Sequence, residues 1–168
     1  MNHDSYSDLY ILRILERVRT LAMVGASDLW NRPSFFAMKY LQEKAYRVIP
    51  VNPRLAATGA SVLGERVYAS LAEVPAPFEL VDFYLRSSAV GAVVDEAIAV
   101  APEKGIQVIW MQLGVRDGAA AERAERAGLE VVMDRCPKIE WGRLHAELSW
   151  GGFNSRVITA RRRRVAAR

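Results

Sequence analysis

The chain has 168 residues, of which 51% are hydrophobic and 25% charged, a composition typical of one globular domain. Its single cysteine, Cys136, excludes an internal disulfide, so the fold does not depend on oxidation and a cytoplasmic location is expected. No apolar run reaches the roughly 20 residues of a spanning helix, and the N-terminus does not resemble a signal peptide. We therefore expect neither membrane insertion nor secretion.

The net charge of +4 belongs to one end of the chain. Residues 156–168 carry six arginines, including the run Arg161 to Arg164, and no acidic residue. Removing these six from the 23 basic residues leaves 17 against 19 acidic ones, a net charge of −2 for residues 1–155. We therefore expect a folded domain over residues 1–150 and a basic arm or tail over residues 151–168.

Hydropathy patterning predicts an alternation of helices and strands. Apolar residues spaced three and four apart indicate helices, and short continuous apolar runs indicate strands buried on both faces. Helices are expected at 8–19, 33–44, 87–101, 117–127 and 139–148, and strands at 20–24, 46–51, 80–85, 106–111 and 129–133. Pro102 and Gly105 should end the third helix. Residues 54–77 should form loop, with one helical turn at 70–74.

This alternation predicts an α/β fold, Rossmann-like and doubly wound, with a mainly parallel five-stranded sheet and helices on both faces. Such sheets bind ligands beyond the carboxyl ends of their strands. Four strand ends are therefore the candidate site: residues 25–27, 52–54, 85–87 and 112–114.

Gly25, Ala26 and Ser27 form the first of these ends. A glycine permits close backbone approach, the serine hydroxyl can donate, and a helix start favours an anion, so a phosphate or pyrophosphate fits here. The segment lacks the further glycines of the dinucleotide fingerprint and the lysine of a Walker loop. An ordinary turn that simply needs glycine is the alternative.

The second end points to a phosphorylated ribose. An NAD site should carry an acidic residue after the second strand, but this chain has Asn52, Pro53 and Arg54 there. A neutral amide and a guanidinium suit the phosphate of NADP or coenzyme A. Arg32, ahead of the helix at 33–44, is a second candidate phosphate clamp. The alternative for both arginines is ordinary surface charge.

The third and fourth ends offer polar groups and a second glycine. The residues concerned are Leu85, Arg86, Ser87, Gln112, Leu113 and Gly114. Their joint position at adjacent strand ends predicts that they line a groove for a pantetheine arm or a nicotinamide. The alternative for each residue taken singly is a structural role.

Groups for catalysis are few. His3 and His145 are the only histidines, and each lies where no acid–base partner is expected. No cluster has metal-ligand spacing. Cys136 follows the fifth strand, and flanking Arg135 and Lys138 would lower its pKa, which makes a reactive thiol conceivable. A buried, unreactive cysteine is the preferred interpretation, and a mixed disulfide with a CoA thiol is a secondary hypothesis.

Six ordered motifs carry a resemblance to a known family. They are Val24-Gly-Ala-Ser27, Asn31-Arg-Pro-Ser34, Tyr46-Arg-Val-Ile-Pro-Val-Asn-Pro53, Gly64-Glu-Arg-Val-Tyr-Ala-Ser-Leu71, Val108-Ile-Trp-Met-Gln-Leu-Gly114 and Val132-Met-Asp-Arg-Cys136. Together they resemble the stand-alone bacterial and archaeal CoA-binding proteins, which are similar to the N-terminal CoA-binding domain of the succinyl-CoA synthetase alpha subunit. The resemblance covers about residues 10–145.

The resemblance implies that CoA or an acyl-CoA is the ligand. The turn at 25–27 would face phosphate, with Arg32 beside it, and residues 52–54 would lie near the phosphorylated adenosine. Residues 85–87 and 112–114 match the segments that follow the third and fourth strands in the family. The phosphorylated histidine of the synthetases belongs to a later domain that this chain lacks, so ligase activity is not expected.

The sequence therefore predicts a protein that binds CoA without chemistry of its own, in a regulatory or carrier role. An NADP-dependent oxidoreductase is the alternative, and binding of nucleic acid or another anionic partner through the arginine-rich tail is the second alternative. Nucleic acid and membrane partners are not expected. A protein partner or a homo-oligomer is left open.

Overall fold

The computed structural model describes residues 2–75 and 77–145. Five parallel strands form one sheet in the order β2-β1-β5-β6-β7, which confirms the predicted Rossmann-like α/β fold. The strands are β1 (Thr20–Val24), β2 (Arg47–Val51), β5 (Leu80–Phe83), β6 (Val108–Met111) and β7 (Glu130–Val132). The strand order reverses between β1 and β5, so the switch point at which such sheets bind ligands lies at the centre of the sheet.

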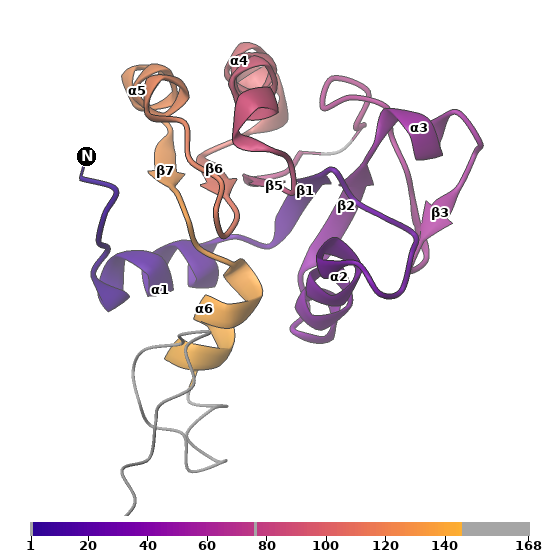
Figure 1. The fold of residues 1–168 in the computed structure, drawn as a ribbon, viewed down its shortest axis with the longest axis horizontal. Helices are drawn as coiled ribbons and strands as arrows, with labels where there is room; N and C mark the ends of the chain where they lie inside the picture. The colour runs from indigo at the N-terminus through magenta and orange to yellow at the C-terminus, as the bar shows by residue number, and fades with distance from the viewer. Residues whose placement is uncertain (1, 76, 146–168) are drawn as a thin grey trace, which may run out of the picture.

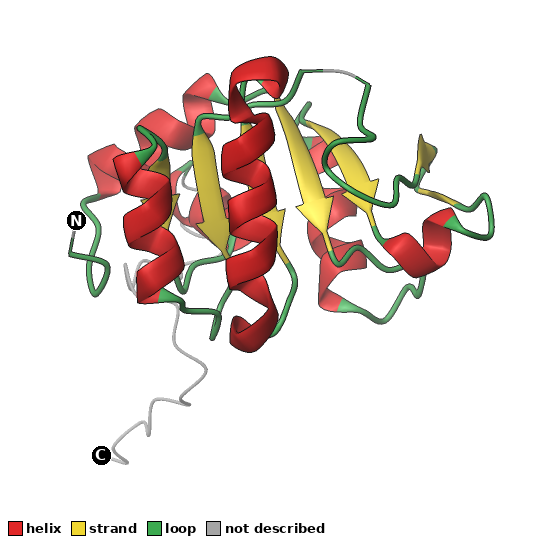
Figure 2. Ribbon diagram, turned by 90° about the horizontal axis from the view of Figure 1, so that it is seen from above, coloured by secondary structure: helices red, strands yellow, loops and turns green. Residues whose placement is uncertain are grey.

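Helices cover both faces of the sheet. The elements α4 (Ser87–Lys104) and α5 (Gly118–Arg126) lie on one face, and α1 (Asp8–Arg17), α2 (Pro33–Glu43) and α6 (Pro137–Leu144) lie on the other (Figure 1). Figure 2, seen from above, shows α4 and α5 crossing in front of the strands. No helix within the described residues is long and apolar enough to cross a bilayer.

Local signals explain where the helices begin and end. The Ser7 hydroxyl accepts from the Tyr10 N–H at the start of α1, and the Asp117 carboxylate accepts from the Ala120 N–H at the start of α5. The helices α2 and α6 both open with a proline, which lacks the N–H that a first helical turn leaves unpaired.

The side chains of each strand alternate between two apolar layers. In β5, Val81 and Phe83 belong to the layer beneath α4 and α5, whereas Leu80 and the following Tyr84 belong to the layer beneath α1, α2 and α6. The same alternation directs Asp82 into this second layer. An acidic side chain thus lies inside an otherwise apolar face of the central strand.

Residues 53–74 differ from the loop that the sequence predicts. Pro53 opens a one-turn helix, α3 (Pro53–Ala56), because the Asn52 side chain accepts from two of its N–H groups. A two-stranded hairpin follows, with β3 (Ser61–Val62) antiparallel to β4 (Glu65–Arg66). The helical turn expected at 70–74 is wrong, since those residues form bends and a turn.

Pro102 does not end α4. It lies inside the helix, which continues to Lys104 and ends at Gly105, where the N–H bonds to the Ala101 carbonyl and φ is 78°. The predicted helix at 139–148 begins two residues earlier, at Pro137. The arm expected at 151–168 falls outside the described residues.

Candidate ligand-binding site

The turn after β1 packs so closely against the residue that follows β5, Tyr84, that position 25 requires glycine. Gly25 has φ +82°, and its N–H donates to the Val51 carbonyl at 2.9 Å. A Cβ at this position would lie 2.3 Å from the Tyr84 carbonyl oxygen. The alternative of a structural glycine is therefore sufficient to explain Gly25 itself. The N–H groups of Ala26 and Ser27 donate to no described residue, so these two amides are the ones that can face an anion.

Asn52 ties this turn to α3. Its amide Nδ2 donates to the Ala26 carbonyl at 2.8 Å, while its Oδ1 accepts from the N–H groups of Arg54 and Leu55. Both ends of the amide are thus used within the protein. Asn52 therefore positions the turn at residues 25–27 and holds the exposed Arg54 beside that turn.

The third and fourth strand ends are joined by short polar contacts. The Ser87 hydroxyl accepts from the Arg116 N–H at 3.1 Å and lies 3.5 Å from the Gly114 carbonyl oxygen. The Gly114 N–H donates to the Asp134 carboxylate at 2.8 Å. These bonds fix the loop after β6 against the start of α4 and the end of β7.

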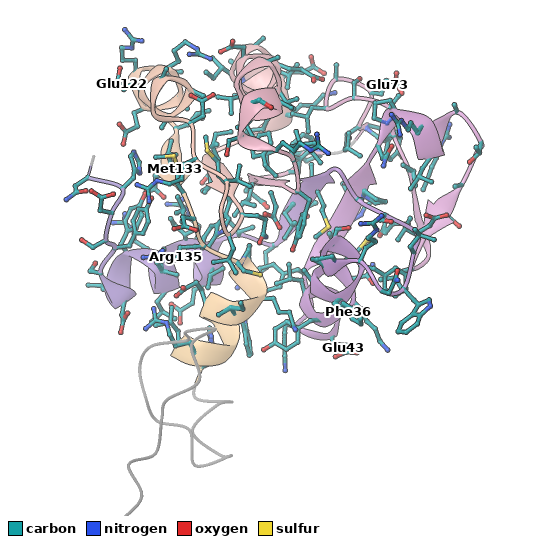
Figure 3. All side chains as sticks on the ribbon, in the orientation of Figure 1. Phe36, Glu43, Glu73, Glu122, Met133 and Arg135 are labelled. Carbon is teal, nitrogen blue, oxygen red and sulfur yellow. The ribbon has the colours of Figure 1, made fainter. Side chains whose placement is uncertain are left out.

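A cavity of about 540 Å³ opens at the carboxyl ends of β5 and β6. Its walls come from α2, from the loop after β6 and from the first turn of α6. Figure 3 labels Phe36 on α2 and Arg135 in the segment leading into α6, the two helices between which the cavity lies. The lining residues are Pro33, Phe36, Ala37, Tyr84, Leu85, Gln112, Leu113, Val115, Cys136, Lys138 and Ile139. A largely apolar cavity at strand ends is the expected form of a small-molecule site.

Large apolar side chains are exposed at this edge of the molecule. Phe36 and Leu113, which line the cavity, are 46% and 56% exposed. Leu29 and Trp30, in the loop between β1 and α2, are 51% and 73% exposed. The fifth large apolar side chain that is exposed among the described residues, Leu9, lies apart from them on α1.

Gln112, which lines the cavity, is hydrogen-bonded to the buried Asp82. The Gln112 amide Nε2 donates to both carboxylate oxygens of Asp82, at 2.9 and 3.1 Å. Asp82 is fully buried, and burial raises its pKa to about 8, although the Gln112 hydrogen bonds oppose that rise. No described cation is paired with this carboxyl group.

Tyr84 and Cys136 also line the cavity. The Tyr84 hydroxyl is buried and has no hydrogen bond with fitting geometry among the described residues. Burial raises the pKa of both this phenol and the Cys136 thiol, and the nearby Asp82 carboxyl raises both further. The lowered thiol pKa predicted from Arg135 and Lys138 is wrong, because desolvation by burial dominates and raises the pKa of Cys136. The preferred interpretation, a buried cysteine, is confirmed.

Three exposed arginines surround the strand ends. Arg32 precedes α2, Arg54 lies in α3 and Arg86 precedes α4. None of the three forms an ion pair with a described residue. In contrast, Arg13, Arg17, Arg47, Arg116, Arg123, Arg135 and Arg143 are all paired with carboxylates.

The structure brings only part of the sequence-predicted site into the cavity itself. Leu85, Gln112 and Leu113 line it, while the residues of the first and second ends lie along the same edge of the sheet, toward α3 (Figure 1). Sequence reasoning missed the residues of α2 and α6, and it missed Asp82 within a strand interpreted as buried. Two features of the sequence could have indicated them. Asp82 is an acidic residue inside an apolar run, and Phe36 is a phenylalanine on the polar side of an amphipathic helix.

The fold and this edge define a Rossmann-like domain with an apolar cavity and three exposed arginines, unpaired within the described part of the chain, at the carboxyl ends of its strands. The model of the CoA binding domain family matches residues 19–142, and the chain belongs to that family. The predicted family resemblance is therefore confirmed.

Similar proteins agree with this assignment. Protein YneT of Bacillus subtilis (strain 168) is 33% identical over 129 residues, which are 77% of this chain and 90% of that protein. A hypothetical protein from Pyrococcus horikoshii OT3 is 35% identical with a TM-score of 0.77, over 86% of this chain and 96% of that one. A Thermus thermophilus structure, cell-free ID.343, is 32% identical with a TM-score of 0.76, over 83% and 99% of the two chains.

A larger enzyme shares the fold alone. An acetyl-coenzyme A synthetase of Ca. Korarchaeum cryptofilum has a TM-score of 0.54 and 20% identity, and the match covers 67% of this chain and 25% of the synthetase.

Proposed function

We propose that the protein binds CoA or an acyl-CoA across the carboxyl edge of its sheet and carries out no reaction on it. The observation that carries this proposal is the apolar cavity at the ends of β5 and β6 in a chain that belongs to the CoA binding domain family. In this arrangement the pantetheine arm occupies the cavity between α2 and α6, and the adenosine end extends along the edge toward α3.

The charges along the edge suit the phosphates of CoA. The guanidinium groups of Arg32, Arg54 and Arg86 have no ion pair among the described residues and are exposed. The N–H groups of Ala26 and Ser27 are likewise available between them. A guanidinium binds phosphate oxygens bidentately, so we assign Arg54 to the 3′-phosphate and the turn at 25–27 to the pyrophosphate.

The burial of the titratable groups at the cavity supports a regulatory or carrier role: Asp82 lies beneath it, fully buried and hydrogen-bonded to Gln112. Raised pKa values keep the Tyr84 phenol and the Cys136 thiol protonated near neutral pH. The two histidines lie elsewhere: His3 contacts Tyr6, and His145 stacks on Trp141 at a ring distance of 3.9 Å. The groups facing the ligand are suited to holding it by shape and hydrogen bonding.

Isothermal titration calorimetry with CoA, 3′-dephospho-CoA and NADP tests the proposal. CoA should bind about tenfold more tightly than 3′-dephospho-CoA, since a charge-assisted hydrogen bond contributes on the order of 1.5 kcal/mol. In the variant Arg54→Ala the two ligands should bind equally. The matched control is Arg126→Ala, an exposed arginine of α5 whose side chain donates to the Glu122 backbone carbonyl.

Two results would count against the proposal. Equal affinity of the wild-type protein for CoA and 3′-dephospho-CoA would remove the role assigned to Arg54. Binding of NADP but not of CoA would replace the proposed ligand by a dinucleotide. Native mass spectrometry of the protein as purified adds a direct check, because a retained CoA would be identified by its mass.

A further inference from the structure

Asp82 occupies a costly position that neither the fold nor the proposed function explains. It lies at the centre of the sheet, where its register neighbours are Met23 of β1 and Trp110 of β6. Its carboxyl group is fully buried, and its only described hydrogen-bond partner is the Gln112 amide. A buried carboxyl group without a cation destabilises a fold, so an apolar residue would serve the core better.

The geometry gives this carboxylate a directional effect on Gln112. An ionised carboxylate only accepts hydrogen bonds, so it draws the NH₂ end of the amide toward itself. The amide is planar, and its Oε1 is therefore turned away from Asp82. Gln112 lines the cavity, and no described residue donates to its Oε1. Gln112 therefore presents its Oε1 to the cavity as a hydrogen-bond acceptor. The hydrogen bonds from its Nε2 to Asp82 fix the orientation of that acceptor.

We propose that Asp82 is a positioning residue that fixes Gln112 so that its Oε1 accepts a hydrogen bond from an amide N–H of the pantetheine arm. The inference rests on the proposed function, since a pantetheine arm carries two amide groups in an otherwise flexible chain. Fixing the amide in advance lowers the entropy cost of forming this bond when the ligand enters.

Protonation of Asp82 should reverse the arrangement. A neutral carboxyl group has an O–H that needs an acceptor. The Gln112 side chain is already hydrogen-bonded to Asp82, and its Oε1 is the carbonyl oxygen that can accept this O–H. Pairing with that O–H would turn Oε1 away from the ligand. Among the described residues, the other titratable groups facing Asp82 are Tyr84, directly after β5, and Cys136 ahead of α6, and raised pKa values keep both neutral below pH 8.

CoA affinity measured by calorimetry between pH 6.5 and 8.5 tests the proposal. If CoA binding requires ionised Asp82, the CoA affinity of the wild-type protein should rise with pH. The rise should reach up to about tenfold per pH unit below the pKa of Asp82. The isosteric variant Asp82→Asn should lose this part of the pH dependence. Titration of the ligand's own phosphates is common to both proteins and cancels in the comparison.

Two further measurements keep the result interpretable. Gln112→Leu, which keeps the volume but removes the acceptor, should weaken CoA binding about tenfold at pH 8.5 and remove the same pH dependence. In the ligand-free protein, the nitrogen-15 resonance of the Gln112 side-chain amide should titrate with Asp82 and be constant in Asp82→Asn. Circular dichroism establishes that both variants are folded.

The outcomes separate this inference from the proposed function. If CoA binds but Asp82→Asn keeps the wild-type affinity and pH profile, the positioning role is overturned while CoA binding stands. A Gln112 amide that does not titrate in the ligand-free protein overturns it as well. If CoA does not bind the wild-type protein at all, the proposed function fails, and with it the pantetheine contact.

Discussion

At the amino ends of the strands, Glu79 and Glu130 are bonded to neighbouring elements, whereas at the carboxyl ends Arg32, Arg54 and Arg86 form no ion pair with a described residue. Glu79, ahead of β5, accepts from the N–H groups of Arg19 and Thr20, which closes the start of β1. Glu130, at the start of β7, is paired with two arginines of α1. The two carboxylates at the amino edge therefore contribute to stability, whereas the three guanidinium groups at the carboxyl edge are the ones that the proposed ligand would engage.

Substitution of Gly25 should have the largest effect on the carboxyl edge. Gly25→Ala places a Cβ 2.3 Å from the Tyr84 carbonyl oxygen in a left-handed backbone conformation, so the strand end must shift. We expect a loss of about 3 kcal/mol in the free energy of unfolding, measured by denaturant titration, together with loss of CoA binding.

The matched control for this change is Gly64→Ala in the hairpin. Gly64 also has a positive φ, +84°, but nothing lies within 4 Å of an added Cβ. Its cost should be limited to conformational strain, about 1 kcal/mol. Equal costs at the two positions would contradict the close approach of the β1 and β5 ends.

Asp82 should make stability fall as the pH rises. Its pKa in the folded protein is about 8, against an ordinary value of 3.8, so the folded state holds a proton that the unfolded state has lost between these values. Unfolding free energy should therefore decrease by up to about 1.4 kcal/mol per pH unit below pH 8 and level off above it. Asp82→Asn should remove this slope. A wild-type slope that survives in the variant would assign the effect to another group.

The opposite signs of the two pH effects distinguish Asp82 from a general surface titration. Stability of the ligand-free protein should fall toward pH 8 while CoA affinity rises over the same range. A buried carboxyl that costs stability and improves binding is the behaviour expected of a residue retained for a ligand.

Glu79 provides the corresponding test of the amino edge. Glu79→Ala removes the acceptor of two backbone N–H groups and should lower the unfolding free energy by about 1–2 kcal/mol, with CoA affinity unchanged. Glu122→Ala on the exposed side of α5, labelled in Figure 3, makes the same charge change without such contacts. A fall in CoA affinity in Glu79→Ala beyond that in Glu122→Ala would show that the two edges are not independent.

The smallest expected effect concerns Cys136. Burial raises its thiol pKa, so alkylation by iodoacetamide at pH 7.5 should be at least about tenfold slower than that of free cysteine. Bound CoA should slow it further, because Cys136 lines the cavity. Alkylation at the rate of free cysteine would contradict the burial of the thiol. Intact mass after incubation with CoA disulfide tests whether a mixed disulfide forms.

Much of the fold could be predicted from the sequence because its signals are local. Strand β1 is apolar at successive positions from Leu21 to Val24, and Pro33 opens α2 as a helix-starting proline should. The hairpin of β3 and β4 could not be predicted, since strands of two residues carry no periodic pattern. The helix α3 depends on the Asn52 side chain, which was interpreted only as a ligand contact.

The candidate site was predicted less completely than the fold because its walls come from different elements. Gln112 was found from its place after a strand, but Phe36 and Ile139 reach the cavity only through the packing of α2 and α6. The hydrogen bond between Gln112 and Asp82 joins residues 30 positions apart, one directly after β6 and the other in the neighbouring β5. Such a contact follows from strand register, which a single sequence does not reveal.

A crystal structure of the protein with CoA tests the central claim most directly. The pantetheine arm is predicted to lie in the cavity between α2 and α6, with an amide N–H on the Gln112 Oε1 and the 3′-phosphate on Arg54. CoA bound at another surface, or a pantetheine arm that leaves this cavity empty, would contradict the account.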